Sequence, residues 1–323
     1  MIRTIYRNGK GNITTDVPLT HWKVTLHDKE GLFWVDFGNE PKEQVEKTLT
    51  EVFKFHPLAI DDALKEAHVP KVDDWGDYVY VVVHGLSFNE TSYELETHEI
   101  DIFLGKNFLV THHKNPFASA DYVWNTCQRD TRYLARGADY LLYNIIDTLA
   151  TDLMPIVDKM DDAIDHLEDD VFTGADRTVL NRIFSIKRAV LHLRRIIIPQ
   201  REVMNRLARD TYAVVDPSER IYFRDIYDHF VRLADINDTL RDLISGTLDT
   251  YLSVTANRTN DVMKVLTILT ALFMPLTFFT GFFGMNFETL PFGSAAFFVA
   301  MMAMTITIPF LLWRWFKQRG WIE

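Results

Sequence analysis

The sequence predicts an α/β cytoplasmic N-domain, then a long stalk helix, then two C-terminal transmembrane helices. Three observations predict this fold class. Strand and helix patterns alternate over roughly the first 120 residues. A helical pattern of about 65 residues follows further along the chain. Two uncharged apolar segments then lie close together near the C-terminus, at 265–283 and 295–313.

The N-domain is expected to cover residues 1–121. Strand patterns occupy three stretches, at 32–37, 78–83 and 95–110. The last stretch alternates and is broken at Gly105-Lys106-Asn107, which predicts a hairpin. Residues 41–55 carry apolar side chains at helical spacing, so a helix is expected between the first two strands.

A helical region is expected over residues 122–259. Apolar residues recur at helical spacing in two stretches on either side of Gly174, at 139–168 and 177–208. Asp216-Pro217 then marks a helix start, because proline is favoured in the first turn. No other proline occurs before Pro275, so one helix of roughly 95 Å is predicted. A helix of this length implies a stalk, and stalks packed side by side in an oligomer would form a funnel.

Charge and cysteine content argue against some classes of function. A formal charge of −11 argues against nucleic-acid binding, which needs clustered Lys and Arg. The single Cys127 excludes an internal disulfide and a thiolate metal site. The first residues lack the apolar core of a signal peptide, so the N-domain is expected to stay in the cytoplasm.

Two polar features of the soluble part each have two interpretations. Seven acidic residues lie at helical spacing between Asp158 and Asp170. A solvated face is the preferred interpretation of this run, and a cation-attracting surface is the alternative. His112 and His113 end the predicted hairpin, where a surface pair is preferred over a metal site.

Residues 260–323 are expected to form the two transmembrane helices. Each apolar segment has about 19 residues, near the length that crosses a bilayer core, and a pair of buried core helices is the alternative. Lys and Arg flank both segments, whereas the loop 284–294 has neither. This charge bias places both termini in the cytoplasm and the loop outside. Trp313, Trp315 and Trp321 follow the second segment, as aromatic residues do at a membrane interface.

The first span carries a stripe of polar and small side chains. At 100° per residue, Met263, Met274 and Thr277 fall on this stripe, and Leu266 lies at its edge. The stripe fits a helix-packing face and a pore lining about equally well. Because two spans cannot enclose a pore alone, a channel requires an oligomer.

The tripeptide Gly284-Met285-Asn286 closes the first span. An uncharged Asn at the mouth of a span suits an ion that is handled through its water shell. Four further motifs accompany it in order: His56-Pro57-Leu58 with Asp61-Asp62, Tyr222-Phe223-Arg224-Asp225, Asn260-Asp261-Val262-Met263 and Met274-Pro275-Leu276. With these motifs, the chain from about residue 50 to its end resembles the CorA family of magnesium transporters.

The resemblance implies a homopentameric protein of the cell (inner) membrane whose first spans line a pore for Mg2+. Co2+ and Ni2+ are possible further substrates. Gly284, Met285 and Asn286 would form the selectivity filter, with Asn286 as a ring at the outer mouth. Five residues would line or gate the pore: Asn260, Met263, Leu266, Met274 and Thr277.

The resemblance also implies a regulatory metal site. Asp62 of one copy would face Asp225 of its neighbour, and bound Mg2+ would relieve the repulsion between the two carboxylates. High internal magnesium would then hold the ring closed.

The outer loop departs from the family pattern, because it keeps Glu288 but lacks a second acid. The choice among divalent cations therefore stays open at this point. A zinc transporter of the same superfamily is one alternative, although Met285 favours the magnesium branch. A membrane-anchored binding domain is another. No nucleophile constellation or phosphate-binding glycine loop occurs, so an enzyme is not expected.

Overall fold

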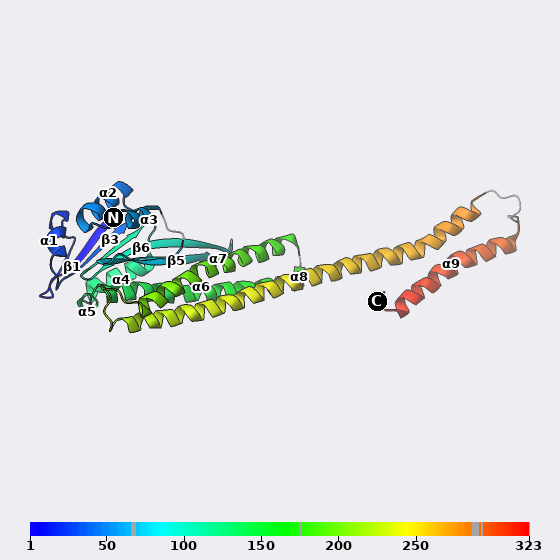
Figure 1. Cartoon of the computed structure of the whole chain (residues 1–323). Coiled ribbons are helices and arrows are strands. Elements are labelled where there is room, and N and C mark those ends of the chain that lie inside the picture. The colour runs from blue at the N-terminus through cyan, green and yellow to red at the C-terminus, as the bar shows by residue number, and fades with distance from the viewer. Residues whose placement is uncertain (66–68, 175, 286–290, 292, 323) are drawn as a thin grey trace. The chain divides into compact units, whose positions relative to one another are not determined.

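The structure is a computed structural model that describes residues 1–65, 69–174, 176–285, 291 and 293–322 (Figure 1). The chain divides into two compact units, Met1–Leu248 and Asp249–Glu323. The first unit contains a mixed sheet with helices on both faces. The second contains the apolar helical segments.

A seven-stranded sheet forms the centre of the first unit, in the order β2-β1-β3-β7-β6-β5-β4. The strands are β1 (Ile2–Arg7), β2 (Ile13–Thr15), β3 (Leu32–Gly38), β4 (Lys71–Asp74), β5 (Tyr78–Asn89), β6 (Glu94–Gly105) and β7 (Phe108–His113). Strands β3 and β7 pair in parallel, and the other neighbours pair antiparallel. The β5–β6 hairpin is long. His84 and Glu99 are paired residues near its middle.

Short helices cover one face of the sheet: η1 (Leu19–His21), α1 (Trp22–Leu26), α2 (Lys42–Thr48), the π-helical turn η2 (Leu49–Phe53) and α3 (Pro57–Lys65). Phe33, Val35 and Phe37 alternate along β3 and join the core under these helices. Trp34 points to the opposite face, where its ring lies 4.8 Å from that of Trp124 in α4 (Ala118–Arg129). Figure 1 shows α2 and α3 on one side of the sheet and α4 on the other.

Two long helices follow α4 and the short α5 (Arg132–Ala135), namely α6 (Ala138–Gly174) and α7 (Arg177–Arg209). Each buries an apolar stripe at helical spacing. Asp176 caps α7, because its side chain accepts hydrogen bonds from the backbone N–H groups of Thr178 and Val179. Between Asp158 and Asp170, six of the seven acidic residues are exposed and Asp170 is half-buried, as both a solvated face and a cation-attracting surface require.

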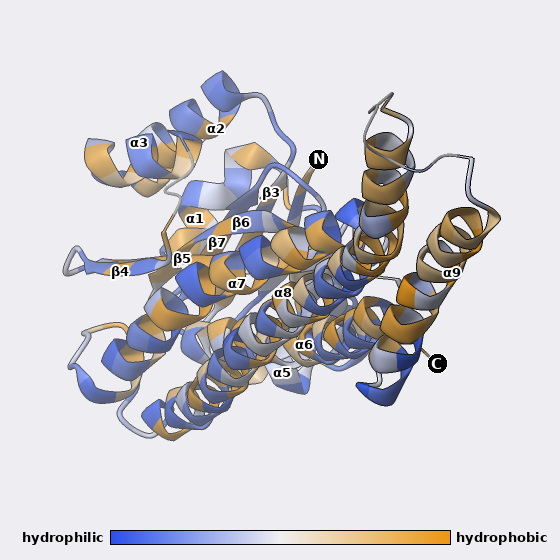
Figure 2. Cartoon of the chain, turned by 90° about the vertical axis from the view of Figure 1, so that its right-hand side faces the viewer, coloured by the Kyte–Doolittle hydropathy of each residue, from blue (hydrophilic) through white to orange (hydrophobic). Residues whose placement is uncertain are grey.

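The helix α8 (Arg220–Phe283) is continuous over 64 residues, and α9 (Ala295–Gln318) has 24. Both are long and apolar enough to cross a membrane. Only 6% of the most apolar window of α8 and none of that of α9 is buried among the described residues, so these two windows are not part of the core of this chain. Figure 2 shows α9 in mostly hydrophobic colours, whereas α6 and α7 mix both kinds of residue.

Most predicted elements are confirmed by the structure. The β6–β7 hairpin turns at Gly105, as predicted. Gly174 ends α6, and the long helix α8 runs through Pro275. The predicted start at Asp216-Pro217 lies a few residues before Arg220, because Asp216 first forms a turn in which its carboxylate accepts from Ser218 N. The patterns do not reveal β1, β2 and β4, which are short and lie toward the edges of the sheet.

Candidate ion pathway and metal-binding groups

The stripe predicted on the first span is exposed in the second unit. Met263, Leu266 and Met274 have exposed fractions of 54%, 55% and 70%. Asn260 and Thr277, also predicted to line the pore, are exposed as well. Such large apolar side chains are costly to leave in water, so this surface of α8 needs lipid or further copies of the chain to cover it.

Thr277 has a hydroxyl that is already committed to its own helix. Its Oγ1 donates to the Phe273 carbonyl at 3.0 Å. The Thr267 hydroxyl likewise donates to the Met263 carbonyl at 2.7 Å, and the Thr270 hydroxyl donates to the Leu266 carbonyl at 2.8 Å. Because the hydroxyl proton is used, each oxygen offers its free lone pairs outward as acceptors. This polarity suits the hydrogen atoms of water around a cation better than it suits an anion.

Gly284 is required by the geometry at the end of α8. Its N–H donates to the Thr280 carbonyl at 2.9 Å. A Cβ added at Gly284 would stand 2.8 Å from that same carbonyl oxygen, which is closer than real Cβ contacts. The absence of a side chain therefore lets the chain leave the helix at this point. Met285 follows and is 52% exposed.

The rest of the predicted outer mouth, Asn286 and Glu288, lies outside the described residues. At the other end of the span, Asn260 and Met263 line an open hollow of about 640 Å3 together with Trp321. Lys264 in the same wall pairs with Asp261 at 3.1 Å. The Asn260 amide therefore lies in a polar, open setting at the N-terminal end of the apolar segment.

Asp62 lies on α3 and already has a cationic partner in its own chain. Lys71 Nζ lies 2.5 Å from Asp62 and 3.0 Å from Asp73. Partial burial lowers the pKa of Lys71, but the hydrogen bonds to the two carboxylates outweigh it and raise the pKa overall. A metal ion at Asp62 must therefore compete with the Lys71 ammonium.

Asp225 lies on α8 beside two further candidate ligands, Asp147 of α6 and His229. One ligand atom from each of the three lies within 4.8 Å of the others, a spacing at which they could hold a metal ion. Burial raises the pKa of Asp147, with a further contribution from the neighbouring Asp225 carboxylate, while His229 lowers it. A cation between the two carboxylates would relieve their repulsion.

The predicted partner of Asp225 was Asp62 of a second copy, a pairing that one chain does not test. Asp147 and His229 are the additional residues that the structure brings to Asp225. The spacing of Asp225 and His229, four residues apart in one helix, is a signal that could have revealed the second ligand. No local signal marks Asp147, because α6 and α8 are distant in the sequence.

The interpretation of His112 and His113 as a surface pair is wrong. They are 3% and 5% exposed, since β7 is an interior strand of the sheet. His112 Nδ1 lies 3.4 Å from Asp101, and His113 Nε2 lies 3.3 Å from Asp36. Burial raises the pKa of Asp101 to about 6, against the lowering effect of His112.

Comparison with known proteins gives a consistent result. The family model described as CorA-like Mg2+ transporter protein matches residues 29–318. The chain is 34% identical over 315 residues to the cobalt/magnesium transport protein CorA of Thermotoga maritima. The aligned region covers 96% of this chain and 88% of the relative. A more distant relative, the zinc transport protein ZntB of Yersinia pestis, is 26% identical over 274 residues, 82% and 81% of the two chains.

A solved structure supports the fold over the full length. The complete structure of the CorA magnesium transporter from Methanocaldococcus jannaschii matches with a TM-score of 0.85 at 23% identity. The match covers 99% of this chain and 98% of that one. The fold of this chain is therefore shared with that structure over nearly its whole length.

Proposed function

The chain belongs to the CorA-like Mg2+ transporter family, and we propose that it forms a homopentameric channel for Mg2+ in the cell membrane. Co2+ is the proposed second substrate, because the relative from T. maritima is a cobalt/magnesium transport protein by name. The observation that carries the proposal is the stripe of Met263, Leu266 and Met274, which one chain leaves exposed on α8. Copies of α8 arranged in a ring would cover this stripe and enclose a pathway.

The chemistry of the stripe suits a hydrated divalent cation. Mg2+ gives up its water reluctantly, so a ring of Asn286 amide oxygens at the outer mouth would accept hydrogen bonds from that water. Further along, the Thr277 oxygen presents acceptor lone pairs. Met263 and Leu266 would form an apolar constriction, which can close by losing its water. Selection would thus come from the water shell, and gating from the apolar ring.

Orientation and substrate range follow from the same residues. Both termini would lie in the cytoplasm and the loop 284–294 outside, because Lys and Arg flank the spans and are absent from the loop. Ni2+ would also pass. A zinc-carrying relative is the alternative, but it is the more distant match, and Met285 favours magnesium.

Regulation would act through Asp225. Internal Mg2+ bound there would hold two carboxylates together and close the channel, with Asp62 of a neighbouring copy as the predicted second ligand. The group of Asp147, Asp225 and His229 offers a second way to bind the ion within one chain. In both arrangements, loss of Mg2+ restores the repulsion and releases the closed state.

The Asn286→Ala substitution tests the filter. Removal of the amide takes away the acceptor for the water shell, so Mg2+ uptake should fall to background. The measurement is growth at low magnesium of cells that lack other importers. Asn205→Ala is the control, because this amide lies on α7 and bonds Glu202 at 3.4 Å. Rescue by Asn286→Ala equal to that by the wild type would remove Asn286 from the filter.

A further inference from the structure

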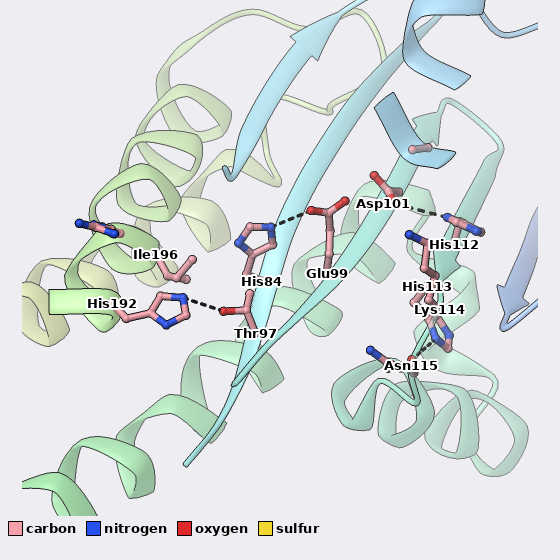
Figure 3. A pocket seen from close by; sticks show the side chains of 12 residues that line it. His84, Thr97, Glu99, Asp101, His112, His113, Lys114, Asn115, His192 and Ile196 are labelled. Atoms are coloured by element: carbon pink, nitrogen blue, oxygen red, sulfur yellow. Dashed lines mark hydrogen bonds and ion pairs between the residues drawn. The ribbon is translucent and has the colours of Figure 1, made fainter. Parts of the chain in front are cut away.

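A polar cavity of about 430 Å3 lies in the N-terminal unit and has no part in the proposed ion pathway. Its walls come from β5, β6, β7 and the segment that follows β7, and from α7, with one residue of α3. Four histidines and two carboxylates line it: His84, His112, His113, His192, Glu99 and Asp101. Figure 3 shows these side chains around the opening. Imidazole is a common ligand for transition metals, so each of these rings is a candidate ligand.

His84 has the environment of a preoriented metal ligand. Its side chain is 2% exposed, and its Nε2 lies 3.0 Å from the Glu99 carboxylate across the β5–β6 pair. In the neutral ring, Nε2–H donates to Glu99 and leaves a lone pair on Nδ1. That Nδ1 is buried and has no hydrogen-bond partner among the residues that the structure describes. Metal-binding histidines usually donate their other N–H to a carboxylate or carbonyl in this way.

His192 of α7 supplies a second imidazole to the same cavity. Its Nε2 lies 3.0 Å from Thr97 Oγ1, as Figure 3 shows. Burial lowers the pKa of His192, and the nearby Arg195 and His84 lower it further. In the neutral ring, Nε2 can accept the Thr97 hydroxyl proton or bind a metal. His84 and His192 both line this cavity.

The backbone around the two rings is fixed. The His84 N–H donates to the Gln200 side chain of α7 at 2.6 Å. His192, Ile196 and Gln200 are spaced four residues apart, so they share one face of the helix. Ile196 lines the cavity and is buried. The contact at Gln200 therefore holds the face that carries His192 against β5.

We propose that His84 and His192 bind one divalent transition-metal ion of the borderline class, such as Ni2+, Co2+ or Zn2+. Nδ1 of His84 and Nε2 of His192 are the ligand atoms, and Glu99 orients His84 from behind. The Thr97 hydroxyl and water complete the coordination. Mg2+ is excluded, because it requires oxygen ligands in a near-octahedral arrangement.

The other charges of the cavity leave this pair available. Asp101 is occupied by Tyr80, whose hydroxyl donates to it at 2.5 Å, and by His112. His113 is turned to Asp36 and to the Asn115 carbonyl. Lys114 and Arg195 bring positive charge to the wall, and Glu99 with Asp101 offsets it. The bound ion would join α7 to the sheet, so it would stabilise the N-terminal unit.

The test is direct binding of Ni2+ to the full chain in detergent, by titration calorimetry with excess Mg2+ present. His229→Ala serves as the background, so that the separate group around Asp225 contributes no imidazole. His84→Ala and His192→Ala should each weaken Ni2+ binding about tenfold or more. His98→Ala is the matched control: it removes the neighbouring histidine of β6, which bonds Ser87 instead.

Two further measurements keep the proposal testable if an alanine variant folds poorly. Glu99→Gln keeps the shape of the side chain and should weaken Ni2+ binding by about tenfold, because His84 loses its carboxylate partner. Ni2+ should raise the thermal midpoint of the wild type by more than Mg2+ does at the same concentration, and this extra rise should be lost in His84→Ala and His192→Ala. Equal Ni2+ affinity in the wild type, His84→Ala and His192→Ala would overturn the proposal. The assignment does not depend on transport, so it can fail or succeed independently of the proposed channel.

Discussion

The Gly284→Ala substitution is expected to reduce Mg2+ transport about tenfold or more, because overpacking of this kind costs about 1–3 kcal/mol. The new methyl group would stand 2.8 Å from the Thr280 carbonyl oxygen. That oxygen cannot swing away like a flexible side chain, since it belongs to the helix backbone. The chain after Phe283 must shift instead, and the shift displaces Met285 and the predicted filter residue Asn286.

The measurement is initial Mg2+ uptake into cells at matched amounts of protein in the membrane. Gly246→Ala is the control, because it lies in the same helix and its added Cβ meets no described atom of the chain within 4 Å. Uptake by Gly284→Ala within twofold of the wild type would show that the helix end tolerates a side chain, and would contradict the close-approach argument.

The Asp225→Lys substitution is expected to make Mg2+ influx insensitive to internal Mg2+ by holding the channel closed. A lysine ammonium in place of the carboxylate would take the position of the cation, relieve the repulsion toward Asp147 as bound Mg2+ would, and repel any ion bound by Asp147 and His229. Mg2+ influx at low internal magnesium should then stay at the low level that the wild type shows only at high internal magnesium. The measurement is influx into vesicles loaded with graded concentrations of Mg2+.

Asp228→Lys is the matched control, since it makes the same charge change three residues along α8 at another exposed position. Two more variants separate the possible sites. Asp147→Asn should alter the dependence of influx on internal Mg2+ if the ion is held within one chain, and Asp62→Lys should alter it if the ion is held between copies. Normal inhibition in Asp225→Lys would remove this residue from the sensor.

Elements with a strong local pattern are the ones that sequence reasoning can predict. The long helix α8 has continuous helical spacing and no proline before Pro275, so its length of 64 residues follows closely. The β5–β6–β7 region alternates and breaks at Gly105. By contrast, β1 pairs with β3 further along the chain and β4 is a short strand on the adjacent β5, and their own residues carry little periodicity.

The candidate sites follow the same division. The stripe of Met263, Met274 and Thr277 depends on the period of one helix, so its exposure on one chain could be expected. The group around Asp225 requires α6 and α8 to meet, and no local pattern brings Asp147 to it. The prediction of a surface position for His112 fails because the polarity of its side chain gives no indication that β7 lies inside the sheet.

The central claim is that this chain carries divalent cations through a pathway lined by α8. The most direct test is ion flux into liposomes that contain the purified full chain, with Mg2+, Co2+, Ni2+ and Zn2+ compared one at a time and Mg2+ either present or absent inside. We expect the flux of Mg2+, Co2+ and Ni2+ to exceed the flux of Zn2+. This flux should be suppressed when Mg2+ is present inside those liposomes whose N-terminal units face the lumen. No divalent flux above that of empty liposomes would contradict it and would favour a membrane-anchored binding domain.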